Sequence, residues 1–178
     1  MIGESNISVK PNMIREPAIE PMWPVDWAEV RAIYIEGIAT GQATFETDAP
    51  SWEDWDAAHL GFGRLVARVG GTISGWAALS PVSRRQVYAG MAEVSVYVAA
   101  NHRNAGVGRA LLDTLVGESE RNGIWMLQAA VFPENTATFA LHLRCGFRQA
   151  GRRERIGKLN GEWRDTILLE RRSALIGT

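Results

Sequence analysis

Residues 93–112 constrain the possible fold of this chain more than any other segment. Apolar and polar residues alternate over 91–98, which predicts a β-strand. A loop with two glycines follows, and from residue 107 apolar residues recur at helical spacing up to 121. A second apolar run at 124–131 predicts another strand. This strand–helix–strand crossover predicts a sheet covered by helices.

Other patterns predict hairpins and helices on both sides of the crossover. Glycine pairs or Asn-Gly between alternating runs indicate two-residue hairpin turns, and a glycine after a periodic segment indicates a helix end. We predict strands at 13–19, 64–69, 72–79, 147–155 and 163–170, and helices at 24–38, from Ser51, and at 135–145. The chain is therefore predicted to be a mixed α/β (α+β) protein dominated by hairpins.

Composition narrows the function classes. The 178 residues, 46% of them hydrophobic, suit one domain with a substantial core. A net charge of −1 argues against binding nucleic acid by bulk electrostatics. The sequence contains no apolar run long enough to span a bilayer, so we expect no membrane partner.

The ends and the single cysteine give two further expectations. Residues 1–12 are polar and lack the apolar segment of a signal peptide, so we interpret them as a disordered extension before one domain at 13–173. Cys145 is the only cysteine, which excludes an internal disulfide, argues against a zinc site and suits the cytoplasm. We expect no metal.

The loop between the predicted strand and helix is a candidate phosphate site. Glycines let the backbone approach a ligand, and the first amides of a helix favour an anion. A dinucleotide fingerprint would need a third glycine where Leu111 stands, and a Walker loop would need Lys after Gly108, where Arg109 stands. Both alternatives fail, although a plain glycine turn remains open at this point.

Arg103, Gly106 and Gly108 fit the pattern Arg/Gln-x-x-Gly-x-Gly/Ala. In this the chain resembles the GNAT superfamily of N-acetyltransferases, and the resemblance extends in order through 93–98, 107–112, 133–135 and 141–147. It implies a mostly antiparallel central sheet with a splayed strand pair and helices on both faces. The run 43–47, with Tyr88 and Glu93, resembles the phosphinothricin and methionine sulfoximine acetyltransferase branch.

The resemblance implies acetyl-CoA as co-substrate. Strand backbone would pair with the pantetheine arm, and loop amides would hold the pyrophosphate. Asn135 matches an asparagine that contacts the cofactor, although an asparagine at a helix start is also a common N-cap. The implied cofactor-binding residues are Val96, Tyr97, Val98, Arg103, Asn104, Ala105, Gly106, Val107, Gly108, Arg109 and Asn135.

The resemblance also places a general base. An amine acceptor is mostly protonated at neutral pH, so a base must remove a proton before attack. Glu93 stands on the polar side of its strand and matches that role, and the alternative is a solvated carboxylate. His142 occupies a position where many superfamily members have a tyrosine acid, but we do not assign it a catalytic role because histidines in a core or on a surface are common.

We expect the acceptor to bind at two loops. An amino-acid carboxylate needs a cation, and arginine can bind it in a bidentate manner, although Arg84 and Arg85 could equally form a solvated turn. The predicted substrate-binding residues are Phe45, Glu46, Arg85, Gln86, Val87 and Tyr88.

The sequence therefore predicts an enzyme that moves an acetyl group from acetyl-CoA to the α-amino group of a small amino acid or analogue, such as methionine sulfoximine, methionine sulfone or phosphinothricin. The resemblance implies direct attack in a ternary complex and a homodimer. Acetylation of a protein N-terminus or an aminoglycoside remains an alternative. So does a non-catalytic acyl-CoA-binding module, which would not need Glu93.

Overall fold

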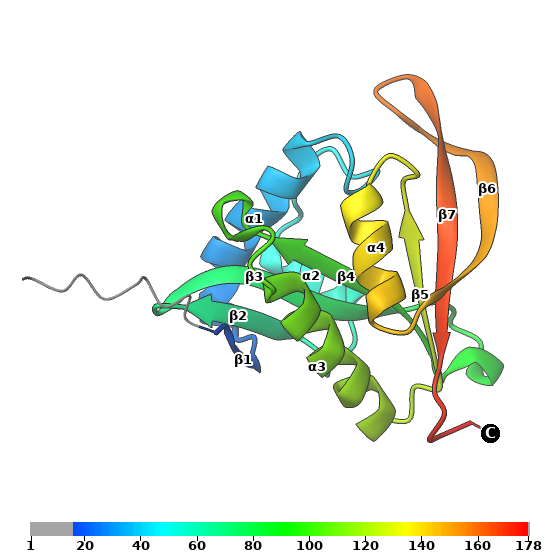
Figure 1. The fold of residues 1–178 in the computed structure, drawn as a ribbon, viewed down its shortest axis with the longest axis horizontal. Helices are drawn as coiled ribbons and strands as arrows, with labels where there is room; N and C mark the ends of the chain where they lie inside the picture. Colours follow the sequence, from blue (N-terminus) through cyan, green and yellow to red (C-terminus); the bar gives the residue numbers. More distant parts are fainter. Residues whose placement is uncertain (1–15, 178) are drawn as a thin grey trace, which may run out of the picture.

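A central seven-stranded sheet, covered by four α-helices, organises the chain (Figure 1). The structure, a computed structural model, describes residues 16–177. The elements in chain order are β1 (Ala18–Pro21), η1 (Pro24–Asp26), α1 (Trp27–Ala39), α2 (Trp52–Ala58), β2 (Leu65–Val69), β3 (Thr72–Pro81), η2 (Gln86–Tyr88), β4 (Met91–Val98), η3 (Ala100–His102), α3 (Val107–Arg121), β5 (Met126–Val131), α4 (Thr136–Arg144), β6 (Arg148–Leu159) and β7 (Glu162–Arg172).

The strand order is β1-β2-β3-β4-β5-β7-β6, and β4–β5 is the parallel pair in an otherwise antiparallel sheet. That parallel pairing spans three residues, ending where Glu93 lies opposite Gln128. Beyond this rung β4 stays paired with β3, while β5 stays paired with β7. The two strands therefore splay apart, and the predicted mostly antiparallel sheet with a splayed pair is confirmed.

Two apolar clusters hold helices against opposite faces of the sheet. Alternation along β3 separates them: Leu79 belongs to the cluster with α3, and Trp76 to the cluster with α1 and α2. Leu111 of α3 and Val30 of α1 are both fully buried in their respective clusters. Helices thus cover both faces, as predicted.

The predicted hairpin turns are present, but the last hairpin is longer than expected. Gly70-Gly71 and Asn160-Gly161 all have positive φ, as a type I′ turn requires. Strands β6 and β7 run over 148–159 and 162–172, with the register shifted between Arg153 and Gly157. This irregularity interrupts the periodicity, which is why the sequence predicted shorter strands.

Two expectations concern the start of the chain. The predicted strand at 13–19 appears as β1 at Ala18–Pro21, and residues 13–15 lie outside the described part. The predicted extension at 1–12 also lies outside it. Among residues 16–177, no helix is both long and apolar enough to cross a membrane.

Replacing Leu111 by alanine tests the cluster beneath α3. Because the side chain is fully buried, we expect the free energy of unfolding to fall by about 2–5 kcal/mol. Leu143→Ala on the exposed side of α4 is the matched control and should cost about 0.5 kcal/mol or less. Urea unfolding monitored by circular dichroism measures both, and equal losses would contradict this packing.

Candidate active site

A cavity of about 280 Å³ lies where β4 and β5 separate. It receives side chains from both strands, from the loop after α1, from α4 and from β7. Its lining residues are Gln42, Ala43, Thr44, Phe45, Glu46, Glu93, Val94, Ser95, Val96, Tyr97, Ala129, Ala130, Val131, Phe132, Asn135, Thr138, His142 and Thr166.

Residues from both faces of the sheet line the cavity. Successive strand residues point to opposite faces, and the lining includes consecutive residues of β4. Val96 packs with the α3 cluster, whereas Tyr97 packs with the α1 and α2 cluster. A ligand bound on the α3 side can therefore meet a second ligand bound on the α1 side.

Glu93 lies at the narrow end of the split, on the last rung shared by β4 and β5. The side-chain amide Nε2 of its cross-strand neighbour Gln128 donates a hydrogen bond of 2.7 Å to Glu93 Oε2. Within residues 16–177 this is the carboxylate's one hydrogen bond, so Oε1 has no partner there. No sequence motif marks Gln128, because it becomes a neighbour of Glu93 only through strand register.

Backbone groups along the split provide a second kind of binding surface. From Val94 onward, β4 pairs with β3 along one edge and has no ladder partner on the β5 side. Backbone N–H and C=O groups need hydrogen-bond partners when they are shielded from water. The backbone of β4 beside the cavity is therefore unpaired on its β5 side, while the predicted contacts of Val96 and Val98 with a pantetheine arm stay predictions; Val96 lines the cavity and Val98 does not.

The loop before α3 has the geometry of an anion cradle. Asn104 and Gly106 have φ of 61° and 82°, and Gly106 is the N-cap of α3. The first amides of this 15-residue helix have no partner within it. A Cβ at Gly108 would lie 3.2 Å from Leu141 Cδ2, so glycine lets the helix start pack closely against α4. Arg103, Asn104, Ala105, Gly106 and Arg109 are exposed and Val107 is buried.

Asn135 is the N-cap of α4. Its Oδ1 accepts a 3.1 Å hydrogen bond from the Thr138 amide, and its Nδ2 donates one of 3.1 Å to the Gln42 carbonyl. Both side-chain polar atoms therefore have partners within the protein. The N-cap interpretation is confirmed, while the cofactor contact stays a prediction.

His142 lines the cavity, although the sequence alone assigns it no role in the site. Its Nδ1 lies 2.8 Å from the Thr138 carbonyl, so Nδ1 carries the proton. Nε2 is buried and has no hydrogen-bond partner among the described residues. Burial lowers the pKa of His142, which favours the neutral ring. In that form Nε2 accepts a hydrogen bond and cannot act as an acid.

The two predicted acceptor loops lie in different places. Phe45 and Glu46 line the cavity, and the Phe45 ring meets Phe132 edge-on at a centroid distance of 4.9 Å. The four residues of the other loop are exposed and are absent from the lining. These four residues are Arg85, Gln86, Val87 and Tyr88.

Charge is unevenly distributed around the cavity. Its charged lining residues are Glu46 and Glu93, and no arginine or lysine lines it among residues 16–177. The Arg85 guanidinium stacks over the Tyr88 ring at 5.5 Å from the centroid. An acceptor carboxylate would therefore need a cation from outside this lining, and the binding role of that loop stays a prediction.

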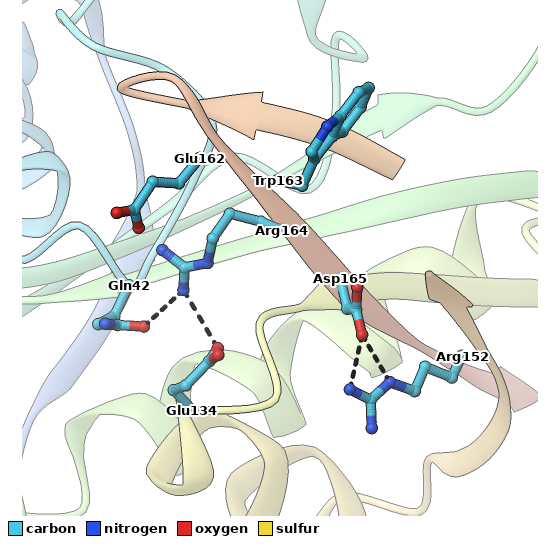
Figure 2. A pocket seen from close by; sticks show the side chains of 7 residues that line it. All are labelled: Gln42, Glu134, Arg152, Glu162, Trp163, Arg164 and Asp165. Carbon is cyan, nitrogen blue, oxygen red and sulfur yellow. Dashed lines mark hydrogen bonds and ion pairs between the residues drawn. The ribbon is translucent and has the colours of Figure 1, made fainter. Parts of the chain in front are cut away.

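A second, polar pocket beside the first contains Arg164, which binds the loop after α1 (Figure 2). Arg164 donates hydrogen bonds of 3.1 Å to the Gly41 carbonyl, 3.0 Å to Gln42 Oε1 and 3.1 Å to Glu134 Oε2. Its guanidinium also lies over the Phe132 ring, 4.3 Å from the centroid. These contacts join β7, the loop after α1 and the segment before α4.

Known proteins share this architecture. Residues 23–147 match the Acetyltransferase (GNAT) family. The chain belongs to the GNAT family. Among the residues that the structure describes, no group of His, Cys, Asp and Glu could hold a metal.

Several curated relatives and a solved structure show which acetyltransferases within the family this chain is similar to. A phosphinothricin N-acetyltransferase of Alcaligenes faecalis is 36% identical over 82% of this chain and 77% of its own. An L-methionine sulfoximine/L-methionine sulfone acetyltransferase of Pseudomonas paraeruginosa is 29% identical over 82% and 88%. A Sinorhizobium meliloti phosphinothricin acetyltransferase in complex with acetyl-CoA superposes with a TM-score of 0.82, at 26% identity, over 92% and 91%. This GNAT protein is thus an acetyl-CoA-dependent N-acetyltransferase.

Two substitutions at Asn135 distinguish the effects of the two hydrogen bonds that its side chain makes. Asn135→Asp keeps the oxygen that caps α4 but loses the donor to Gln42, whereas Asn135→Ala loses both. We expect the alanine variant to lose about 1 kcal/mol of stability and the aspartate variant less. Both should lose acetyl-transfer activity if the bond to Gln42 holds the loop. An aspartate variant with normal activity would contradict that.

The buried ring of His142 predicts a pH dependence of stability. Its pKa in the fold is lower than the ordinary value of 6.5, so below about pH 6.5 the unfolded chain binds more protons at this site. The contribution of neutral His142 to the free energy of unfolding is therefore fully present above pH 6.5, and it is lost as the pH falls towards the lowered pKa. Urea titrations between pH 5 and 8 should show a flatter profile for His142→Gln than for the wild type. Parallel profiles for the two proteins would show that the His142 ring does not contribute to the pH dependence of stability.

Proposed function

We propose that this protein transfers the acetyl group of acetyl-CoA to the α-amino group of a small amino acid or analogue of the methionine sulfoximine, methionine sulfone or phosphinothricin kind. The main support is the position of Glu93 in a cavity that is lined by residues from both faces of the sheet. The named activities of the relatives support the acceptor class.

Glu93 acts as the general base. Its carboxylate takes one proton from the acceptor ammonium, directly or through a water, and the free amine then attacks the thioester carbon. The bond to sulfur breaks as the amide forms, and the second proton of the nitrogen ends on the departing thiolate. Both substrates are bound together, so no acyl-enzyme is needed. Buried Cys145 has a pKa raised to about 12, mainly by burial, which suits packing rather than acyl transfer.

Each of the remaining site elements has a binding task. The β4 edge at Val96, Tyr97 and Val98 pairs with the pantetheine arm, and an amide near Val96 polarises the thioester carbonyl. The amides between Asn104 and Arg109 hold the pyrophosphate. Bound there, the thioester would lie in the split, within reach of an amine beside Glu93.

The acceptor carboxylate would be held by the exposed loop around Arg85, because the cavity lining has no cation of its own among the described residues.

We further propose a homodimer in the cytoplasm, with the exposed Trp163 and Ile156 of the β6–β7 hairpin as apolar contacts. Sedimentation of the wild type and of Trp163→Ser tests the dimer.

Glu93→Gln tests the base. The amide is nearly isosteric but cannot accept the proton, so we expect kcat at neutral pH to fall by roughly 100-fold or more, with the fold intact. Glu162→Gln, at an exposed position in the second pocket, is the matched control and should leave kcat unchanged. A Glu93→Gln enzyme with normal kcat would rule out this base.

The acceptor class is tested by measuring acetyl-CoA consumption with amino acids, methionine analogues, aminoglycosides and peptides. Turnover with methionine sulfoximine or phosphinothricin, but not with peptides, supports the proposal. Turnover with peptides or aminoglycosides alone would reassign the acceptor. Tight CoA binding without any turnover would instead identify a non-catalytic acyl-CoA-binding module.

A further inference from the structure

The last rung of the β4–β5 ladder places a second polar side chain, that of Gln128, beside Glu93. Gln128 is opposite Glu93 on the last rung of the β4–β5 ladder, and the cavity opens directly beyond it. Its Nε2 donates the 2.7 Å hydrogen bond to Glu93 Oε2. Neighbouring side chains on a shared rung point to the same face of a sheet, so this contact follows from the register.

We propose that Gln128 is a positioning residue that fixes which oxygen of Glu93 receives the proton from the acceptor. The inference rests on the proposed role of Glu93 as base. The amide occupies Oε2 and leaves Oε1 without a protein partner among residues 16–177. Oε1 is then the oxygen that meets the acceptor ammonium or an intervening water.

Glu93 needs such an orienting contact because its side chain can adopt several conformations. A glutamate side chain has several rotatable bonds, and half-buried Glu93 lies beside a widening gap rather than in a packed sheet. Small errors in the position of a reacting group lower the rate strongly. A neutral amide donor orients the carboxylate without adding a cation that would repel the acceptor ammonium.

An alternative is that Gln128 only joins the two strands. The backbone already does so, because the amides of Trp125 and Met126 bond to the Gly90 carbonyl and the ladder continues through three residues. The side-chain bond is therefore not needed to hold β4 and β5 together. If Gln128 were only structural, its substitution would lower stability and would reduce kcat equally with or without Glu93. If it positions Glu93, its substitution should reduce kcat only when Glu93 is present.

The test uses the full chain and steady-state kinetics with the best acceptor found in the panel. Gln128→Leu keeps the size and removes the donor, so we expect kcat to fall about tenfold while the KM for acetyl-CoA stays unchanged. In the Glu93→Gln background the same substitution should have no further effect on kcat. Gln149→Leu, the same change at an exposed position on β6, is the matched control and should behave as the wild type.

Gln128→Glu supplies a second, nearly isosteric variant with a different readout. Two carboxylates in contact cannot both ionise easily, so the acidic limb of the kcat–pH profile should move to higher pH. A simple packing defect would lower kcat without moving that limb. This variant also covers the case in which Gln128→Leu fails to fold.

The outcomes separate the two proposals. An inactive Glu93→Gln enzyme together with a fully active Gln128→Leu enzyme would overturn the role of Gln128 and leave the base in place. Equal losses from Gln128→Leu in both backgrounds, with an unmoved pH profile in Gln128→Glu, would also overturn it. Normal kcat in Glu93→Gln would instead reject the proposed function itself.

Discussion

The site depends on the short β4–β5 ladder. Three paired residues hold the two halves of the sheet together, and the pairing stops at Glu93 and Gln128. If it continued, the strand edges would satisfy each other and no cavity could pass between them. Because it stops, unpaired backbone edges, a carboxylate and a cavity lined from both faces of the sheet occur at one place. The strands remain apart because each keeps its other neighbour, β3 or β7.

A network of polar contacts then holds the loop after α1, which lines the cavity. Arg164 binds Gly41, Gln42 and Glu134, and Asn135 binds the Gln42 carbonyl. In Figure 1 this loop, after α1, approaches the start of α4. The loop that carries Phe45 is thus fastened to β7 and α4, the same elements that supply His142 and Thr166 to the cavity. A substitution in this network should therefore change the shape of the cavity even where the substituted residue does not line it.

The sequence predicted the features that depend on local patterns. Alternation located β4, turn residues located both hairpins, and the glycine pattern located the loop before α3 together with the family. It did not reveal Gln128, which meets Glu93 only through register, or Arg164, whose partners are 30 to 123 residues away in the chain. The sequence alone does not distinguish His142 from an ordinary core or surface histidine, because its place in the cavity depends on how α4 packs. Such contacts arise from tertiary packing, which no single-sequence period records.

Two of the buried side-chain atoms that have no hydrogen-bond partner among residues 16–177 lie at the cavity. His142 Nε2 and Thr166 Oγ1 are both buried, line the cavity and have no hydrogen-bond partner among the described residues. They lie on opposite faces of the sheet, because His142 is on α4, whereas Thr166 alternates with Ile167, which packs against the α3 cluster. An unsatisfied buried group costs about 1–3 kcal/mol. Because both atoms line the cavity, a water or a bound ligand can supply the missing partner at each position.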